Sequence, residues 1–271
     1  MSPTTQDAGL ALLKWYADTG ADEAIGNEAA ALYAKEADIM PLPAKGAPIK
    51  QVSLKPQKPK PPSDEEVAEK LQTDAASLAA SCATLDELRA AMEGFDAKAH
   101  FPAARNLVFA DGNPQADVML IGEAPGEEED RQGIPFVGRS GQLLDRMLDA
   151  IGHDRESVYI SNILPWRPMG NRTPTMQEGV IFLPFLMRHI ELAGPRLTVA
   201  LGGSSAKLLL GTNQGIMRLR GHWSEIEVAG RKVPILPTLH PAYLLRNPLA
   251  KREAWADFLN LKQRLCENLN D

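Results

Sequence analysis

The sequence predicts an α/β protein built on a mostly parallel, doubly wound sheet. Apolar runs suited to buried strands recur along the chain, and helical patterns separate them. Strands that alternate with helices in this way are typical of parallel sheets with helices on both faces. The expected strands are 117–121, 158–163, 197–201 and 233–238. The expected helices are 141–151, 177–193, 204–210 and 249–268.

The residues before this alternation predict a helical N-terminal extension and a linker. Large apolar residues recur among alanines within 1–40, which indicates helix. Prolines and lysines alternate over 41–62, and a segment of this composition has little to bury, so we expect an extended, solvated spacer. The third part of the chain is then 63–271, an α/β domain with leading helices.

The sequence predicts where the two leading helices begin. Ser63-Asp64-Glu65-Glu66 is typical of the first turn of a capped helix, which we expect to reach about Ser81. Thr84 is expected to begin a second helix that runs to Glu93.

Composition narrows the class of protein. Of 271 residues 44% are hydrophobic, enough to fill a core, and no apolar run reaches the roughly eighteen residues of a membrane span. The N-terminus lacks a basic segment followed by a long apolar stretch, so no secretory signal is expected. Two cysteines, Cys82 and Cys266, are too few for a disulfide scaffold and indicate a reducing cytoplasm. The net charge of −6 argues against bulk attraction to nucleic acid, although a local basic surface would still supply it.

The connection after the first strand is the segment that best indicates a site. It begins with Gly122-Glu123-Ala124-Pro125-Gly126, which favours a tight turn, and continues through acidic residues 127–130 to Gly138. Connections between strands and helices usually have about two to six residues, and this one is much longer. Ligands of open α/β sheets bind outside the carboxyl ends of the strands. A loop of this length, with Phe136 between glycines, therefore predicts a site at that edge of the sheet.

Several motifs in a fixed order resemble the uracil-DNA glycosylase superfamily, most closely the family 4 enzymes. The family's first motif, GE-[AG]-PG-x-x-E-D followed by G-x-PFVG, is matched from Gly122 to Gly138. A second, H-P-[SA]-Y-L-L-R, is matched by HPAYLLR at 240–246, and YISN at 159–162 and RPMGNR at 167–172 fit the pattern between them. Motifs in the family's order are far more specific than one short pattern. The resemblance covers roughly residues 95 to 262 of the chain.

The resemblance implies a three-layer α/β/α fold and a monofunctional DNA glycosylase. Such an enzyme hydrolyses the N-glycosidic bond of uracil in DNA during base excision repair, and it uses only water. Glu123 would hold the attacking water and face the cationic sugar, with Glu129 in a supporting role. His240 would donate to uracil O2 as negative charge develops there. Glu127 and Glu128 keep the simpler interpretation of a solvated acidic loop.

Recognition of the base is expected from three residues of the same motifs. Phe136 would stack on the flipped uracil, although core packing explains an aromatic side chain equally well. Asn162 ends a strand, and its amide offers one donor and one acceptor, which match O4 and N3–H of uracil and mismatch cytosine. Gly122 completes the expected substrate site.

Contacts with DNA are expected from two loops and an apolar tip. Arg172 lies in a cationic, glycine-bearing loop, and Ser204 begins a helix whose N–H groups suit a phosphate. Leu244 or Leu245, beside Arg246, would wedge into the duplex where the nucleotide has left, but either leucine could equally face the core.

One departure from the family is large. Family 4 enzymes hold a four-iron cluster on four cysteines, and those positions fall here near Phe95, Lys98, Trp166 and Phe182. None is cysteine, so we expect an apolar plug in the vacated space, no metal cluster and no cofactor. We expect a monomer whose partner is uracil-containing DNA.

Two rival functions stay open from the sequence. The first is a DNA-binding protein that lost catalysis together with the cluster, against which the intact Glu123, Asn162 and His240 argue. The second is a serine hydrolase, because Ser204 lies between a strand and a helix with His240 downstream. That pattern fails at Ala206, where a nucleophile elbow has glycine.

Overall fold

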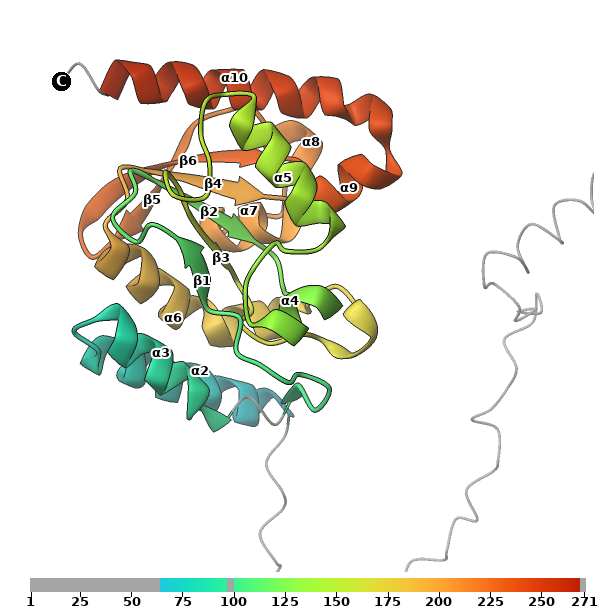
Figure 1. Ribbon diagram of the computed structural model, residues 1–271. Helices are drawn as coiled ribbons and strands as arrows, with labels where there is room; N and C mark the ends of the chain where they lie inside the picture. Colours follow the sequence, from blue (N-terminus) through green and yellow to red (C-terminus); the bar gives the residue numbers. More distant parts are fainter. Residues whose placement is uncertain (1–63, 97–99, 269–271) are drawn as a thin grey trace, which may run out of the picture. The chain divides into compact units, whose positions relative to one another are not determined.

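A six-stranded sheet forms the centre of the computed structural model, which describes residues 64–96 and 100–268 (Figure 1). The strand order is β1-β3-β2-β4-β6-β5. Strands β3, β2, β4 and β6 run parallel, while β1 and β5 pair antiparallel at the two edges. The bounds are β1 Ala110–Gly112, β2 Val118–Gly122, β3 Tyr159–Asn162, β4 Leu197–Leu201, β5 Ser224–Val228 and β6 Arg231–Thr238. The predicted mostly parallel sheet is confirmed, and the two antiparallel edge strands are additions to it.

Helices cover both faces of this sheet and confirm the three-layer architecture. They are α2 Asp64–Ser81, α3 Leu85–Glu93, α4 Glu127–Gln132, α5 Arg139–Asp149, α6 Met176–Ala193, α7 Gly203–Leu210, α8 Ile216–Leu219, α9 Pro241–Arg246 and α10 Lys251–Asn268. Single 3₁₀ turns, η2 (Met169–Asn171) and η3 (Pro248–Ala250), precede α6 and α10. The short helices α4, α8 and α9 were not predicted.

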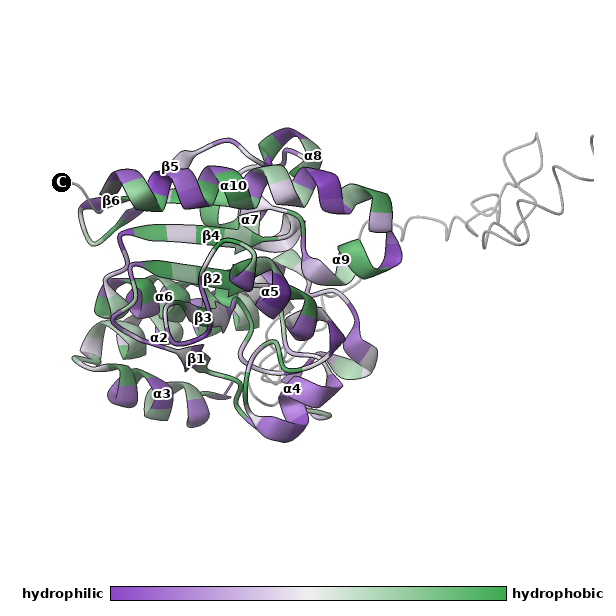
Figure 2. Ribbon diagram, turned by 45° about the horizontal axis from the view of Figure 1, so that its top comes forward, coloured by the Kyte–Doolittle hydropathy of each residue, from purple (hydrophilic) through white to green (hydrophobic). Residues whose placement is uncertain are grey.

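Side chains that alternate along the strands build two cores, one on each face. Val118 and Leu120 of β2 belong to the core beneath α5 and α10, whereas Met119 and Ile121 belong to the core beneath α6. Figure 1 shows α5 and α10 on one side of the sheet and α6 with α2 and α3 on the other. In Figure 2 the central strands are largely hydrophobic, as strands buried on both faces must be, while α4 is almost wholly hydrophilic.

The leading helices α2 and α3 pack on α6 as an additional layer. The hydroxyl of Thr84 accepts the Glu87 N–H and caps α3, as the sequence predicted. The predicted extension (1–40) and linker (41–62) lie outside the described residues, so that division of the chain stays a prediction. Within the described ranges, no helix is long and apolar enough to cross a membrane.

The order of the strands creates a crevice at one edge of the sheet. From β2 the chain crosses to β3 on one side, and from β3 it crosses back to β4 on the other side of β2. Adjacent loops therefore leave in opposite directions beyond the carboxyl end of β2, and ligands of doubly wound sheets bind at such a switch point.

Candidate active site

A cleft of about 280 Å³ lies at this switch point. Its inner lining comes from the ends of three parallel strands and from the long loop after β2. We call Glu123, Phe136, Asn162 and His240 the floor of the cleft, and Arg172, Tyr243 and Arg246 its rim. Residues predicted from distant parts of the sequence thus meet in one place.

Glu123 follows β2 directly and has a partly exposed carboxylate in the cleft. Burial raises its pKa above the ordinary value, while a hydrogen bond from the Ser204 hydroxyl and the positive charge of Arg246 oppose that rise. A partly desolvated carboxylate held by a donor and a nearby cation suits a group that takes a proton from water.

His240 lies between β6 and α9 and caps the helix. Its Nδ1 atom accepts the backbone N–H of Ala242 at 3.1 Å. Burial of the ring, together with the charge of Arg246, lowers the pKa of His240 to about 4. The imidazole is therefore neutral at physiological pH, and because Nδ1 is an acceptor, its single proton lies on Nε2. His240 thus offers a hydrogen-bond donor without a formal charge.

Phe136, Asn162 and Gly122 are packed against one another. Asn162 is opposite Gly122 in the parallel register of β3 with β2. A Cβ atom at Gly122 would lie only 2.6 Å from the ring of Phe136 and would also overlap the Asn162 side chain. The absence of a side chain at Gly122 therefore lets the ring and the amide approach the same point. The Phe136 ring centroid is 5.6 Å from that of His240, with the two planes tilted by 31°.

Phe136 fulfils both interpretations of its sequence position. Its side chain is only 4% exposed and belongs to the core that includes Leu144 of α5, yet the ring also lines the cleft. A ring fixed from behind by the core loses little freedom when a base stacks on it.

Glu129 has contacts that the sequence did not indicate. Its Oε1 atom accepts the Gly138 N–H at 2.8 Å and its Oε2 atom accepts the Gly126 N–H at 3.1 Å. The carboxylate thus joins the residue before α4 to the residue before α5. This arrangement favours fixing the loop over the expected role in orienting water.

The two residues expected at phosphates have protein partners. Both Nη atoms of Arg172 donate to the carboxylate of Glu178, at 2.6 and 2.8 Å. The Ser204 hydroxyl donates to Glu123, which is the wrong partner for a nucleophilic serine activated by histidine. The serine-hydrolase interpretation therefore gains nothing from the structure.

The apolar tip of α9 separates the two candidate leucines. Leu244 is 1% exposed and packs with Leu143, Leu239 and Ala254, which is the core position that the sequence left open for either leucine. Leu245 is partly exposed beside Arg246, on a shallow groove that adjoins the cleft. Neighbouring residues on a helix point about 100° apart, so only one of the two leucines faces the core. The sequence alone did not show which face of α9 is buried.

Tyr243 was missed as a site residue. It is 37% exposed and lines the cleft between His240 and Arg246. Its place within HPAYLLR was the available signal, since it lies one helical turn from the histidine that caps α9.

Three of the four positions that correspond to cluster cysteines hold packed aromatic rings. Phe95, Trp166 and Phe182 are all buried in one core, and the rings of Phe95 and Phe182 meet edge to face at 5.9 Å. Lys98 lies outside the described residues. An iron–sulfur cluster takes thiolate ligands, so these side chains do not fit one, and no step of the chemistry goes through a cluster.

Comparisons with known proteins agree with this geometry. The model of the Uracil DNA glycosylase superfamily matches residues 109–259, more than half of the chain and the whole span of the cleft. This chain belongs to the uracil-DNA glycosylase superfamily.

Three relatives of this superfamily member carry the name type-4 uracil-DNA glycosylase. The protein of Thermotoga maritima is 43% identical over 146 residues, which are 52% of this chain and 73% of the relative. That of Saccharolobus solfataricus is 39% identical over 166 residues, 59% of this chain and 77% of the relative. That of Archaeoglobus fulgidus is 39% identical over 165 residues, 59% of this chain and 82% of the relative. The predicted resemblance to family 4 is confirmed.

Proposed function

We propose that this superfamily member excises uracil from DNA by hydrolysing the N-glycosidic bond. The observation that carries the proposal is the convergence of four unlike groups on one cleft: the carboxylate of Glu123, the ring of Phe136, the amide of Asn162 and the neutral imidazole of His240. The names of the relatives support the same substrate.

Recognition begins with a uracil nucleotide drawn out of the stack into the cleft. The Phe136 ring stacks on the base, a contact worth roughly 1–3 kcal/mol. The amide of Asn162 accepts from N3–H and donates to O4, a pairing that cytosine reverses. A base that enters this cleft therefore stacks its face on the Phe136 ring and forms hydrogen bonds through its edge with the Asn162 amide.

The chemistry separates two charges. As the bond between C1′ and N1 breaks, its electron pair passes to the uracil ring, and negative charge develops at O2. His240 donates a hydrogen bond from Nε2 to that oxygen, and because the imidazole is neutral it keeps its proton. The sugar becomes cationic, and the Glu123 carboxylate stabilises it while a water attacks C1′ and gives its proton to Glu123. The products are an abasic site and the uracil anion, and the proton held by Glu123 passes through solvent to the uracil, which restores the carboxylate.

The rim supplies the contacts with DNA in this proposal. Arg172 and Arg246 present cations at the mouth of the cleft, and Leu245 is the side chain of α9 placed to enter the duplex. The backbone N–H groups at the start of α7, around Ser204, suit a phosphate. The reaction needs only water. We predict that the protein is cytoplasmic and that it purifies as a monomer without iron.

The deciding experiment uses oligonucleotide duplexes that carry one uracil opposite each of the four bases, with hypoxanthine, xanthine and thymine duplexes beside them. Alkali cleaves the strand wherever a base was removed. We expect cleavage at uracil and none at thymine. Tight binding without cleavage would favour an inactive DNA-binding relative, and covalent labelling by a fluorophosphonate probe would favour the serine hydrolase.

A further inference from the structure

Phe136 has a backbone conformation that few side chains adopt. Its φ angle is +55°, in the left-handed region, where a bulky residue that is not glycine is strained. Such a conformation persists only where the surroundings impose it. The carbonyl of Phe136 also lies so close to Gly141 that a Cβ atom there would overlap it. The orientation of the ring in the cleft therefore depends on what holds the backbone at 135–136.

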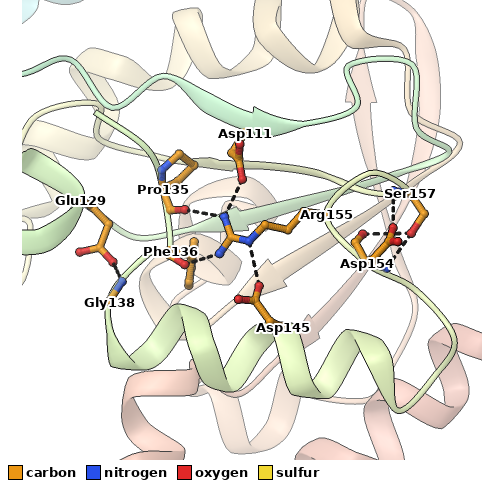
Figure 3. Close-up of polar contacts among 9 residues, drawn as sticks. All are labelled: Asp111, Glu129, Pro135, Phe136, Gly138, Asp145, Asp154, Arg155 and Ser157. Carbon is orange, nitrogen blue, oxygen red and sulfur yellow. Dashed lines mark hydrogen bonds and ion pairs between the residues drawn. The ribbon is translucent and has the colours of Figure 1, made fainter. Parts of the chain in front are cut away.

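Arg155 holds that backbone from outside the cleft. Its Nη1 atom donates to the Pro135 carbonyl at 3.1 Å, and its Nη2 atom donates to the Phe136 carbonyl (Figure 3). Arg155 lies between α5 and β3 and is not among the residues that line the cleft. One guanidinium thus binds two consecutive carbonyl groups, one of them belonging to the strained residue.

The guanidinium is itself fixed by two carboxylates. Asp111 of β1 accepts from Nη1 at 2.6 Å, and Asp145 of α5 accepts from Nε at 2.9 Å (Figure 3). Burial disfavours the charge on Arg155, but the two carboxylates outweigh it, and the pKa of the guanidinium lies above its ordinary value. A strand, a helix and the loop before β3 therefore fix one donor group that faces the loop after β2.

We propose that Arg155 is a positioning residue for base recognition, acting through the backbone of Phe136. The inference rests on the proposed function, since it is the flipped base on which the ring stacks. Only arginine offers a planar fork that binds two carbonyls and two carboxylates together, whereas a lysine ammonium cannot keep that geometry. When the fork is lost, the strain at Phe136 relaxes and the ring leaves the orientation in which it meets uracil.

A general loss of stability is the competing explanation, and the chain offers a matched control. Arg188 of α6 is similarly buried, with 22% of its side chain exposed against 26% for Arg155. It likewise donates to a backbone carbonyl, that of Cys82, and pairs with a carboxylate, that of Glu191. Arg188 lies on the face of the sheet covered by α2 and α3 and does not line the cleft. Arg155→Lys and Arg188→Lys therefore each remove a partly buried guanidinium that binds backbone carbonyl oxygen and carboxylate, and only the first touches the loop of the site.

The first test compares single-turnover excision of uracil by both variants, with enzyme in excess. A small misplacement of a positioned group costs up to about 10²-fold in rate, so we expect Arg155→Lys to be about 10- to 100-fold slower than the parent. Arg188→Lys should keep the parent rate, although both variants should melt at a lower temperature. In a Phe136→Leu background, Arg155→Lys should cause little further loss, because residues that act as a unit are not additive. Full additivity in that background, or a normal rate for Arg155→Lys, would overturn the proposal.

The second test does not depend on activity. Fluorine NMR of protein labelled with 4-fluorophenylalanine gives a resonance for each of seven phenylalanines, and Phe136→Leu identifies the one from Phe136. We expect Arg155→Lys to shift or broaden that resonance, and Arg188→Lys to leave it in place. Asp145→Asn, at a half-exposed carboxylate, should move it in the same direction by less. An unmoved Phe136 resonance would reject the positioning role even if uracil is not the substrate. A moved resonance with no excision by the parent would instead reject the proposed function.

Discussion

The floor and the rim of the cleft are held in different ways. Asn162 and Phe136 are buried, and backbone or core contacts fix them, while Glu123 and His240 each have a hydrogen-bonded partner within the protein. The rim residues Arg172 and Arg246 are exposed side chains. Groups in a dry, fixed environment act on developing charge far more strongly than groups in water. Exposed cations contribute chiefly to salt-dependent binding of the DNA backbone.

This difference predicts a division of labour. Substitutions of Glu123 and His240 in the floor should reduce the rate of excision and leave the affinity for DNA nearly intact, because the contacts of these two residues strengthen in the transition state. Substitutions in the rim should weaken DNA binding, and at a pH where Glu123 is deprotonated they should leave the rate of excision at saturating enzyme unchanged. Four predictions test this division, from the largest expected effect to the smallest.

His240→Ala is expected to have the largest effect. Removal of one donor aimed at a developing oxyanion typically costs about 10²–10³ in rate. We expect that loss in single-turnover excision, with affinity for uracil-containing DNA close to that of the parent. His222→Ala, at an exposed histidine before β5, is the matched control and should be normal. An equal loss of affinity and rate in His240→Ala would move this residue from the floor to the binding surface.

Glu123→Gln is expected to slow excision by at least about 10²-fold, because the amide keeps the size of the side chain but cannot take the proton or stabilise the cationic sugar. Binding of uracil-containing DNA should persist. Glu128→Gln serves as the control, since Glu128 is exposed and pairs with Arg131 in α4. If Glu123→Gln cuts at the normal rate, the buried carboxylate of Glu129 becomes the next candidate.

The pH profile of single-turnover excision is expected to depend on Arg246, whose charge acts on both titratable groups of the floor, Glu123 and His240. The reaction needs Glu123 deprotonated, and burial raises the pKa of Glu123. The rate should therefore rise with pH, with its midpoint above the pKa of an ordinary glutamate. The pKa of His240, about 4, keeps that ring neutral across the same range. The positive charge of Arg246 lowers both pKa values, so Arg246→Gln should raise both and move the acid limb to higher pH.

The parent and Arg246→Gln are compared at saturating enzyme, so that weaker DNA binding by the variant does not affect the measured rate. Glu123→Gln, followed on its slower time scale, should lack the acid limb. An acid limb that is unchanged in Arg246→Gln would show that the rim does not set the charges of the floor.

Much of the floor was predictable because the strands are short apolar runs, and residues at the end of each run or just after it are placed by topology at one edge of the sheet. Glu123, Asn162 and His240 are all of this kind. Phe136 was predictable from the length of its loop. Leu244 and Leu245 were not separable, because only the packing of α9 against α5 and α10 decides which one faces the core.

Other features depend on contacts that sequence spacing does not encode. Glu127 and Glu128 were interpreted as a solvated loop, yet they begin α4, where acidic residues in a first turn are favourable. Glu129, which was expected to orient water, instead turns inward to two backbone N–H groups. The edge strands β1 and β5 lack the apolar runs of the central strands. Arg155 had no signal at all, since its partners Asp111 and Pro135 become neighbours only when the sheet and the loop have formed.

The smallest effect is expected at Arg172, because its charge already has a partner. The side chain of Arg172 is 45% exposed although it pairs with Glu178, so a DNA phosphate can reach the guanidinium and compete with that carboxylate. We expect Arg172→Gln to weaken DNA binding by no more than about fivefold. The slope of log affinity against log salt concentration should become shallower by about one. Glu178→Gln should strengthen DNA binding, because it frees the guanidinium of Arg172. The amide oxygen can still accept the N–H of Thr175, the residue that caps α6. Neither variant should change excision at saturating enzyme. A salt slope that stays at the parent value in Arg172→Gln would mean that this arginine remains with Glu178 when DNA is bound.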